Sequence, residues 1–217
     1  MSAQASSSDR RHDPELFFRH LFQQQKQFWV APFQKERWNS RTPILMIGIS
    51  AASFSLDGAP SRNLREAEVF KGLNDALDST AANWSLAAYP LGLIIVGELT
   101  DRSPLAEYGW KSGEAIVTAF TTMAALKAAT RRARPHTGKT YAFFDRGNSF
   151  PSGHSAAAWA VAAVTVRHFP DHKWIPWVIY PAAAVVTVSR VTTGHHFASD
   201  AFTGAVLGFS IGWWTVR

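Results

Sequence analysis

The residues best suited to chemistry fall into three short clusters in the second half of the chain. The first cluster holds Lys127 and Arg134, followed by Pro135. Residues seven apart lie two turns apart on one helical face, where two cations can bind the same anion. Alone, the cluster also fits a solvent-facing basic helix end, because Arg131 and Arg132 would favour the negative pole of the helix dipole.

The second cluster is the run Pro151-Ser152-Gly153-His154, which comes just before an expected helix. At a helix start, Ser152 and Gly153 present backbone N–H groups that bind anions, and the Ser152 hydroxyl adds a donor. His154 can carry a proton near neutral pH. The same residues also fit a simple helix N-cap followed by a surface histidine.

The third cluster contains Ser189, Arg190, His196 and Asp200. Arg190 offers a planar fork that matches phosphate oxygens. His196 and Asp200 are four apart, so on a helix the carboxylate can reach the imidazole, fix its tautomer and make its other nitrogen nucleophilic. A structural His–Asp pair and a metal site are the alternatives. His195 would point about 100° away on a helix, and we assign it no catalytic role.

Together, the clusters supply every part of one kind of site. Such a site binds a phosphoryl group, supplies a nucleophile that attacks it and protonates its leaving group. The three clusters also resemble the three-part signature of the phosphatidic-acid-phosphatase type 2 superfamily, which reads K-x6-R-P, P-S-G-H and S-R-x5-H-x3-D. Every signature position is filled between Lys127 and Asp200.

The resemblance implies a fold and a set of roles. The fold is an all-α six-helix bundle with a core related to vanadium haloperoxidases. His196 would be the nucleophile that forms a phosphohistidine, Asp200 would orient and polarise it, and His154 would protonate the leaving oxygen and then activate water. No metal and no cofactor are implied. The phosphate-binding residues would be Lys127, Arg134, Ser152, Gly153 and Arg190.

The implied activity is metal-independent hydrolysis of a phosphomonoester or diphosphate. The substrate would be a phosphorylated lipid, of the phosphatidate, phosphatidylglycerophosphate or undecaprenyl diphosphate type, or a small phosphate ester. The alternatives are a soluble periplasmic acid phosphatase and a vanadium-dependent haloperoxidase. A net charge of +6 suits phosphate-bearing partners. Nucleic acid is not expected, because Lys and Arg gather at the motif loops and the N-terminus without a recognisable reading module.

Length and composition limit the surrounding structure. A chain of 217 residues, 47% apolar, fits one domain with a real core. The absence of cysteine excludes a disulfide scaffold, a zinc finger and a thiol nucleophile. The oligomeric state is left open.

The chain divides into three parts by pattern. Residues 1–13 are predicted to be a flexible tail, and 14–41 an amphipathic helix that lies in a membrane interface or packs along the bundle. Residues 42–217 are predicted to form the bundle domain. Its six apolar stretches are roughly 42–56, 86–97, 114–128, 155–166, 174–189 and 201–216.

The location of the protein depends on whether these stretches span a membrane. Most are shorter than the ~20 residues that a spanning helix needs, and a mean hydropathy of −0.08 is low, which favours a soluble or peripheral periplasmic protein. The paired Trp213 and Trp214 and the aromatic N-terminal segment favour membrane contact. The bias of Lys and Arg then places both termini in the cytoplasm of a multi-pass inner-membrane protein. The active site and the segment 57–85, which could recognise the leaving group, would face the periplasm.

Overall fold

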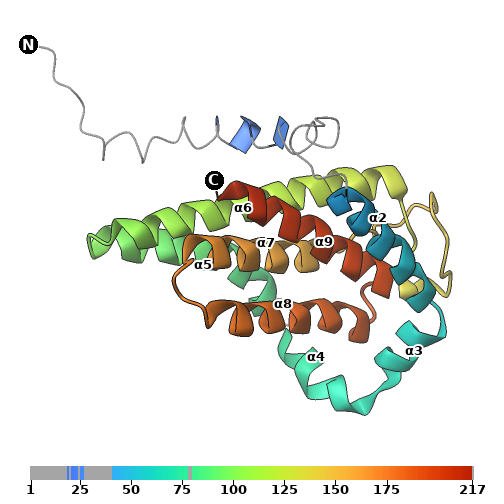
Figure 1. Ribbon diagram of the computed structural model, residues 1–217. Helices are drawn as coiled ribbons and strands as arrows, with labels where there is room; N and C mark the ends of the chain where they lie inside the picture. The colour runs from blue at the N-terminus through green and yellow to red at the C-terminus, as the bar shows by residue number, and fades with distance from the viewer. Residues whose placement is uncertain (1–18, 20, 24, 27–40, 78–79, 217) are drawn as a thin grey trace, which may run out of the picture. The chain divides into compact units, whose positions relative to one another are not determined.

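The computed structural model describes residues 19, 21–23, 25–26, 41–77 and 80–216 (Figure 1). Residues up to Pro43 and residues from Ile44 onward form two separate units. The described residues of 14–41 are helical. The rest of that segment and the tail 1–13 lie outside the described residues, so the predictions made for them stay predictions.

The described part of the chain is all-α and contains no strand, as the resemblance implied. Its elements follow one another in the order α2 (Arg41–Ser53), η3 (Phe54–Leu56), α3 (Ala59–Glu66), η4 (Glu68–Phe70), α4 (Lys71–Leu77), α5 (Thr80–Leu99), α6 (Ser103–Thr130), η5 (Pro135–Thr137), α7 (Gly153–His168), α8 (Ile175–Thr192) and α9 (Ala198–Thr215).

The predicted count of six helices is not confirmed. The six apolar stretches largely coincide with α2, α5, α6, α7, α8 and α9, with the first running on through η3, but the short helices α3 and α4 stand between the first two stretches. Helix α6 begins well before its apolar stretch, because Pro104 suits the first helical turn and starts the helix early.

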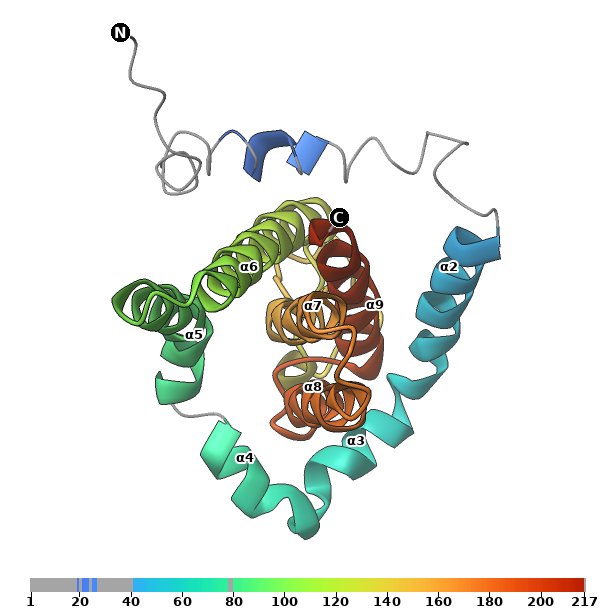
Figure 2. The ribbon, with the colours of Figure 1, turned by 60° about the vertical axis from the view of Figure 1, so that its left-hand side comes forward.

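Helix α7 forms the centre of the bundle. It packs against α6, α8 and α9, and α5 packs on the outer side of α6 (Figure 2). Alanine dominates the buried part of α7, so its neighbours can approach closely.

A row of glycines on α9 allows the closest of these approaches. Gly204, Gly208 and Gly212 recur every four residues on the side of α9 that faces α7. A Cβ atom at Gly208 would lie 2.0 Å from the carbonyl oxygen of Ala156, and one at Gly204 would lie 2.4 Å from that of Ser152. Because only glycine fits this spacing, the two helices are held backbone to backbone, and the start of α7 lies directly beside the start of α9.

Few helices are both long and apolar enough to cross a membrane alone. Among the described residues, α8 meets that test, with a mean hydropathy of 1.3 and a third of it buried. The segments Ile44–Leu56 and Ala59–Glu66 meet it only together, across a 67° bend. The expected multi-pass topology therefore stays a prediction.

Candidate active site

The three clusters meet at one end of the bundle, where α6 and α8 end and α7 and α9 begin (Figure 1). The segment between α6 and α7 joins them. Lys127 Nζ donates to the carbonyl oxygen of Asn148 over 2.5 Å, and the Ser149 hydroxyl donates to Asp200 Oδ2 over 2.5 Å. The backbone amide of Ser152 donates to the carbonyl oxygen of Asp200 over 2.9 Å.

The end of α6 differs from the sequence-based prediction. The helix ends at Thr130, and Arg131 adopts a left-handed conformation with φ 46° while its amide donates to the Lys127 carbonyl. Arg134 therefore lies in extended backbone beyond the helix, and the prediction that Lys127 and Arg134 share a helical face is wrong.

Asn148 brings these two cations together instead. Its carbonyl oxygen accepts a hydrogen bond from Lys127, and its side-chain oxygen accepts one from Arg134 Nε over 2.8 Å. Arg190 lies nearby at the end of α8, where it is 5% exposed and donates through Nε to the Ser189 hydroxyl over 3.2 Å. The site thus gathers three cations from two helix ends and an extended segment.

At the start of α7, Ser152 acts as a helix cap. Its hydroxyl is fully buried and accepts a hydrogen bond from the Ser155 amide over 3.4 Å. Gly153 approaches the Phe120 ring so closely that an added Cβ would lie 3.2 Å from it. The His154 ring meets Phe120 edge to face, at 6.4 Å between ring centroids. The phosphate contacts expected of Ser152 and Gly153 stay predictions.

His196 and Asp200 face each other, but not through a helical turn. His196 lies in the loop before α9, whose first residue is Ala198. Its Nδ1 is 3.6 Å from Asp200 Oδ2, which is within ion-pair range and longer than a hydrogen bond. Since α9 begins after His196, His195 is not on a helix either. The expectation that it points about 100° away, which assumed a helix, therefore does not apply.

His196 is almost fully enclosed, with 4% of its surface exposed. Its amide donates to the carbonyl oxygen of Arg190 over 3.0 Å, which fixes the loop. Burial, opposed by Asp200 and assisted by the neighbouring Lys127 and Arg134 charges, lowers the pKa of His196 to about 4. The imidazole is therefore neutral at pH 7, and Nε2 is the ring nitrogen turned away from Asp200.

Asp200 is held by donors on both of its oxygens. Arg132 Nη1 donates to Oδ1 over 2.6 Å, and the Phe197 amide donates to Oδ2 over 2.9 Å, beside the Ser149 hydroxyl. The bond from Phe197 is half of a capping box at the start of α9. The carboxylate that faces His196 has little freedom to move.

Arg132 is the largest fully buried side chain in the described part of the chain. Its Nη2 donates to Asp57 Oδ2 over 2.6 Å and to the Thr140 carbonyl over 2.7 Å. The interpretation of Arg132 as part of a solvent-facing helix end is therefore wrong. The rings that surround its guanidinium group within 4.4–5.2 Å belong to Phe54, Phe143 and Phe197.

Asp57 completes this buried network. It lies between η3 and α3 and is 1% exposed. One of its oxygens accepts from the Ser199 amide over 2.8 Å, and the other accepts from the Ser199 hydroxyl over 2.6 Å. A carboxylate from the first third of the chain thus caps α9, the helix that carries Asp200. We did not identify Asp57 from the sequence, because a lone aspartate followed by glycine looks like an ordinary turn.

Comparisons with known proteins agree with this arrangement. The family model described as the PAP2 superfamily matches residues 108–217. A lipid A 1-phosphatase from Porphyromonas gingivalis is 38% identical over 68 residues, which is 30% of this chain and 15% of that protein. The chain therefore spans only a small part of that relative.

A solved structure resembles most of the chain. It is described as the first transmembrane PAP2-type phosphatidylglycerolphosphate phosphatase, from Bacillus subtilis. The two chains align with a TM-score of 0.57 and 25% identity, over 82% of this chain and 92% of the other.

Proposed function

Because this chain belongs to the PAP2 superfamily, we propose that it is a phosphatase that releases phosphate from a phosphorylated lipid through a phosphohistidine. The observation that carries the proposal is the buried, neutral His196, which faces Asp200 and lies close enough to Lys127 and Arg134 to be affected by their charges. A neutral imidazole with one free nitrogen is a nucleophile ready at neutral pH.

In the first step, His196 Nε2 attacks phosphorus and the bond to the leaving oxygen breaks. Burial and the nearby Arg190 charge lower the pKa of His154 to about 4, so His154 takes up its proton when the negatively charged phosphate binds. It then gives this proton to the leaving oxygen, and the product leaves as an alcohol or, from a diphosphate, as a phosphate. Asp200 stabilises the positive charge that develops on the His196 ring.

In the second step, His154 takes a proton from water, and the water oxygen attacks the phosphohistidine. The N–P bond breaks, inorganic phosphate leaves, and both histidines return to their starting state. Lys127, Arg134 and Arg190, together with the amide of Gly153, stabilise charge on the phosphoryl oxygens in both steps. These three cations take the place that Mg²⁺ has in other phosphoryl-transfer enzymes, and we expect no metal to be required.

A lipid substrate is supported by the surface of the bundle. Large apolar side chains are exposed along α2, α5 and α8, including Ile44, Ile47, Leu91, Ile95 and Trp177. Apolar surface of this extent marks contact with a membrane or another protein. The names of both similar proteins refer to lipid phosphates. We propose that the protein lies in a bacterial-type inner membrane, and the bias of Lys and Arg supports an active site that faces the periplasm.

A peripheral acid phosphatase is the second candidate. The observation that favours it is that α8 is the one unbroken helix, among the described residues, that is long and apolar enough to span a membrane. Extraction of isolated membranes with alkaline carbonate separates the two candidates. A spanning protein stays in the pellet, and a peripheral one is released.

The function is tested by measuring phosphate release from p-nitrophenyl phosphate, phosphatidate and undecaprenyl diphosphate in detergent with excess EDTA. We expect activity that survives EDTA, is highest on a lipid phosphate and is lost in His196→Ala. Asp171→Asn, a change at an exposed residue away from the site, serves as a matched control. Activity that is unchanged in His196→Ala would refute the mechanism. Release from p-nitrophenyl phosphate alone would refute the lipid substrate.

A further inference from the structure

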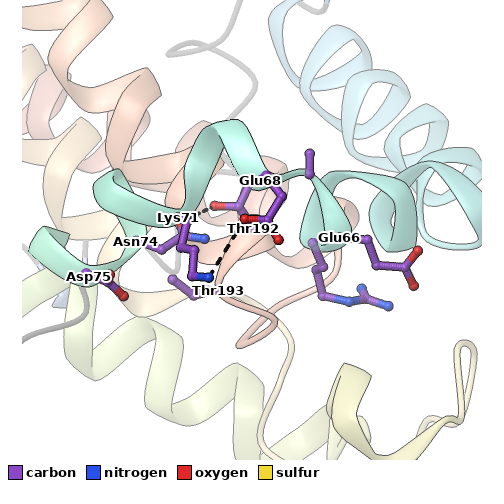
Figure 3. A pocket seen from close by; sticks show the side chains of 9 residues that line it. Glu66, Glu68, Lys71, Asn74, Asp75, Thr192 and Thr193 are labelled. Atoms are coloured by element: carbon purple, nitrogen blue, oxygen red, sulfur yellow. Dashed lines mark hydrogen bonds and ion pairs between the residues drawn. The ribbon is translucent and has the colours of Figure 1, made fainter.

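A polar cavity of about 370 Å³ lies next to the catalytic loop, between the α3–η4–α4 segment and the end of α8 (Figure 3). All of the residues that line it except Ala67 have polar or charged side chains. This size is at the low end for small-molecule sites. It has room for one sugar ring or a glycerol unit.

The cavity is joined directly to the loop that carries His196. Thr192 and Thr193 line it, and they stand between Arg190 and His196 in the sequence. The Thr192 hydroxyl donates to the side-chain oxygen of Asn74 over 2.6 Å, which ties α4 to the end of α8 (Figure 3).

Arg65 makes a second connection to the same loop. Its Cδ atom is 3.2 Å from the position that a Cβ at Gly194 would occupy, and Gly194 has φ 76°. The side chain of Arg65 therefore packs on the backbone two residues before His196. Its Nη1 atom is buried and has no hydrogen-bond partner among the described residues.

The charges in the cavity narrow the choice of ligand. Three carboxylates, Glu66, Glu68 and Asp75, stand against two cations, Arg65 and Lys71, and Lys71 lies 3.8 Å from Glu68. A small carboxylate excess does not favour a second phosphate group, and polar walls do not favour an acyl chain. Carboxylate and amide groups pair well with hydroxyl groups, which both donate and accept.

We propose that this cavity binds a hydroxyl-bearing head group, a sugar or a glycerol, to which the transferred phosphate is attached. This inference rests on the proposed phosphatase function and adds the part of the substrate that the enzyme recognises. Glu66 and Asp75 accept hydrogen bonds from the hydroxyls, and Arg65 Nη1 donates one. The phosphate of the same molecule then lies over the neighbouring His196.

The test compares three substrates in detergent: a lipid glycosyl 1-phosphate, a phosphatidylglycerophosphate, and dodecyl phosphate, which has no hydroxyl groups. The measured quantity is the ratio of kcat/KM for each hydroxyl-bearing substrate to that for dodecyl phosphate. We expect the double variant Glu66→Gln/Asp75→Asn to lower one ratio tenfold or more, mainly through KM, since a site built for hydroxyls loses its discrimination when its acceptors are changed. The ratio that falls identifies the head group as a sugar or a glycerol.

A matched control makes the same change of charge at two positions outside the cavity. Glu107→Gln/Asp171→Asn alters two exposed carboxylates elsewhere and should leave both ratios as in the wild type. Ratios unchanged in the cavity variant would overturn the inference. If that variant fails to fold, Arg65→Gln is measured in the same way. Failure of the wild type to hydrolyse any of the three substrates would instead refute the proposed function.

Discussion

Arg132 Nη1 lies 2.6 Å from Asp200 Oδ1, and neither side chain is reached by solvent. The same guanidinium group holds Asp57 through its other terminal nitrogen. Two carboxylates from distant parts of the chain therefore share one buried cation. Removing one partner of such a network leaves an uncompensated charge in the interior.

Replacing Arg132 should therefore cost far more stability than replacing its neighbour. We expect Arg132→Met to lower the free energy of unfolding by about 3–5 kcal/mol, because Asp57 and Asp200 lose their shared partner. Arg131→Met, at an exposed position, should change it by less than about 0.5 kcal/mol. Chemical denaturation in detergent, followed by tryptophan fluorescence, measures both. Equal losses in the two variants would contradict the buried network as the cause.

Asp200→Asn should preserve most of the packing and remove the charge that faces His196. We expect kcat to fall by about 100-fold or more, because the imidazolium that forms during attack loses its stabilising carboxylate. KM should change little, since Asp200 is buried behind the histidine and away from the substrate. Steady-state kinetics on the preferred substrate separates the two constants. A rise in KM at unchanged kcat would mean that Asp200 supports binding alone.

The pH dependence follows from the loop histidine. In the folded protein the pKa of His196 is about 4, against about 6.5 in an unfolded chain. The unfolded chain therefore takes up the proton first as pH falls, and the contribution of neutral His196 to stability is complete above pH 6.5 and is lost towards pH 4.

This shift is measured by NMR of protein labelled at histidine Cε1. The resonance that disappears in His196→Gln should not titrate between pH 8 and pH 5, whereas free histidine added to the same sample titrates near about 6.5. A midpoint near 6.5 for His196 would show that the imidazole is not shielded.

The glycine row on α9 predicts a selective loss of stability. Gly208→Ala places a methyl group 2.0 Å from the Ala156 carbonyl, so α7 and α9 must move apart, at a cost of about 1–3 kcal/mol. Gly92→Ala has open space around its new Cβ and should gain about 0.5–1 kcal/mol from the helical preference of alanine. Thermal unfolding of the two variants should therefore shift in opposite directions. Equal shifts would exclude the close helix contact as the cause.

The residue types and spacing of the three motifs were enough to predict the family, and the resemblance to that family implied the all-α class. The structure brings Lys127, Arg134, His154, Arg190, His196 and Asp200 to one end of the bundle. Their individual roles stay predictions.

The features missed from the sequence depend on contacts between distant segments. The burial of Arg132 could not be read from helical periodicity, because the left-handed residue Arg131 ends the helix first. Asp57 meets Ser199 across 142 positions, and no local pattern records such a pairing. The helix count was missed because α3 and α4 are short and polar, without the apolar stretch that marks a core helix.

The position of Asp57 also has a consequence for synthesis of the protein. Asp57 and Arg132 leave the ribosome well before Ser199 and Asp200, and their guanidinium–carboxylate pair has no second carboxylate until α9 is made. A nascent chain stalled before Ser199 holds Lys127 and Arg190 but lacks the contact between Asp57 and the start of α9. We therefore expect hydrolytic activity to arise only after Ser199 and Asp200 have been made and have met Asp57 and Arg132.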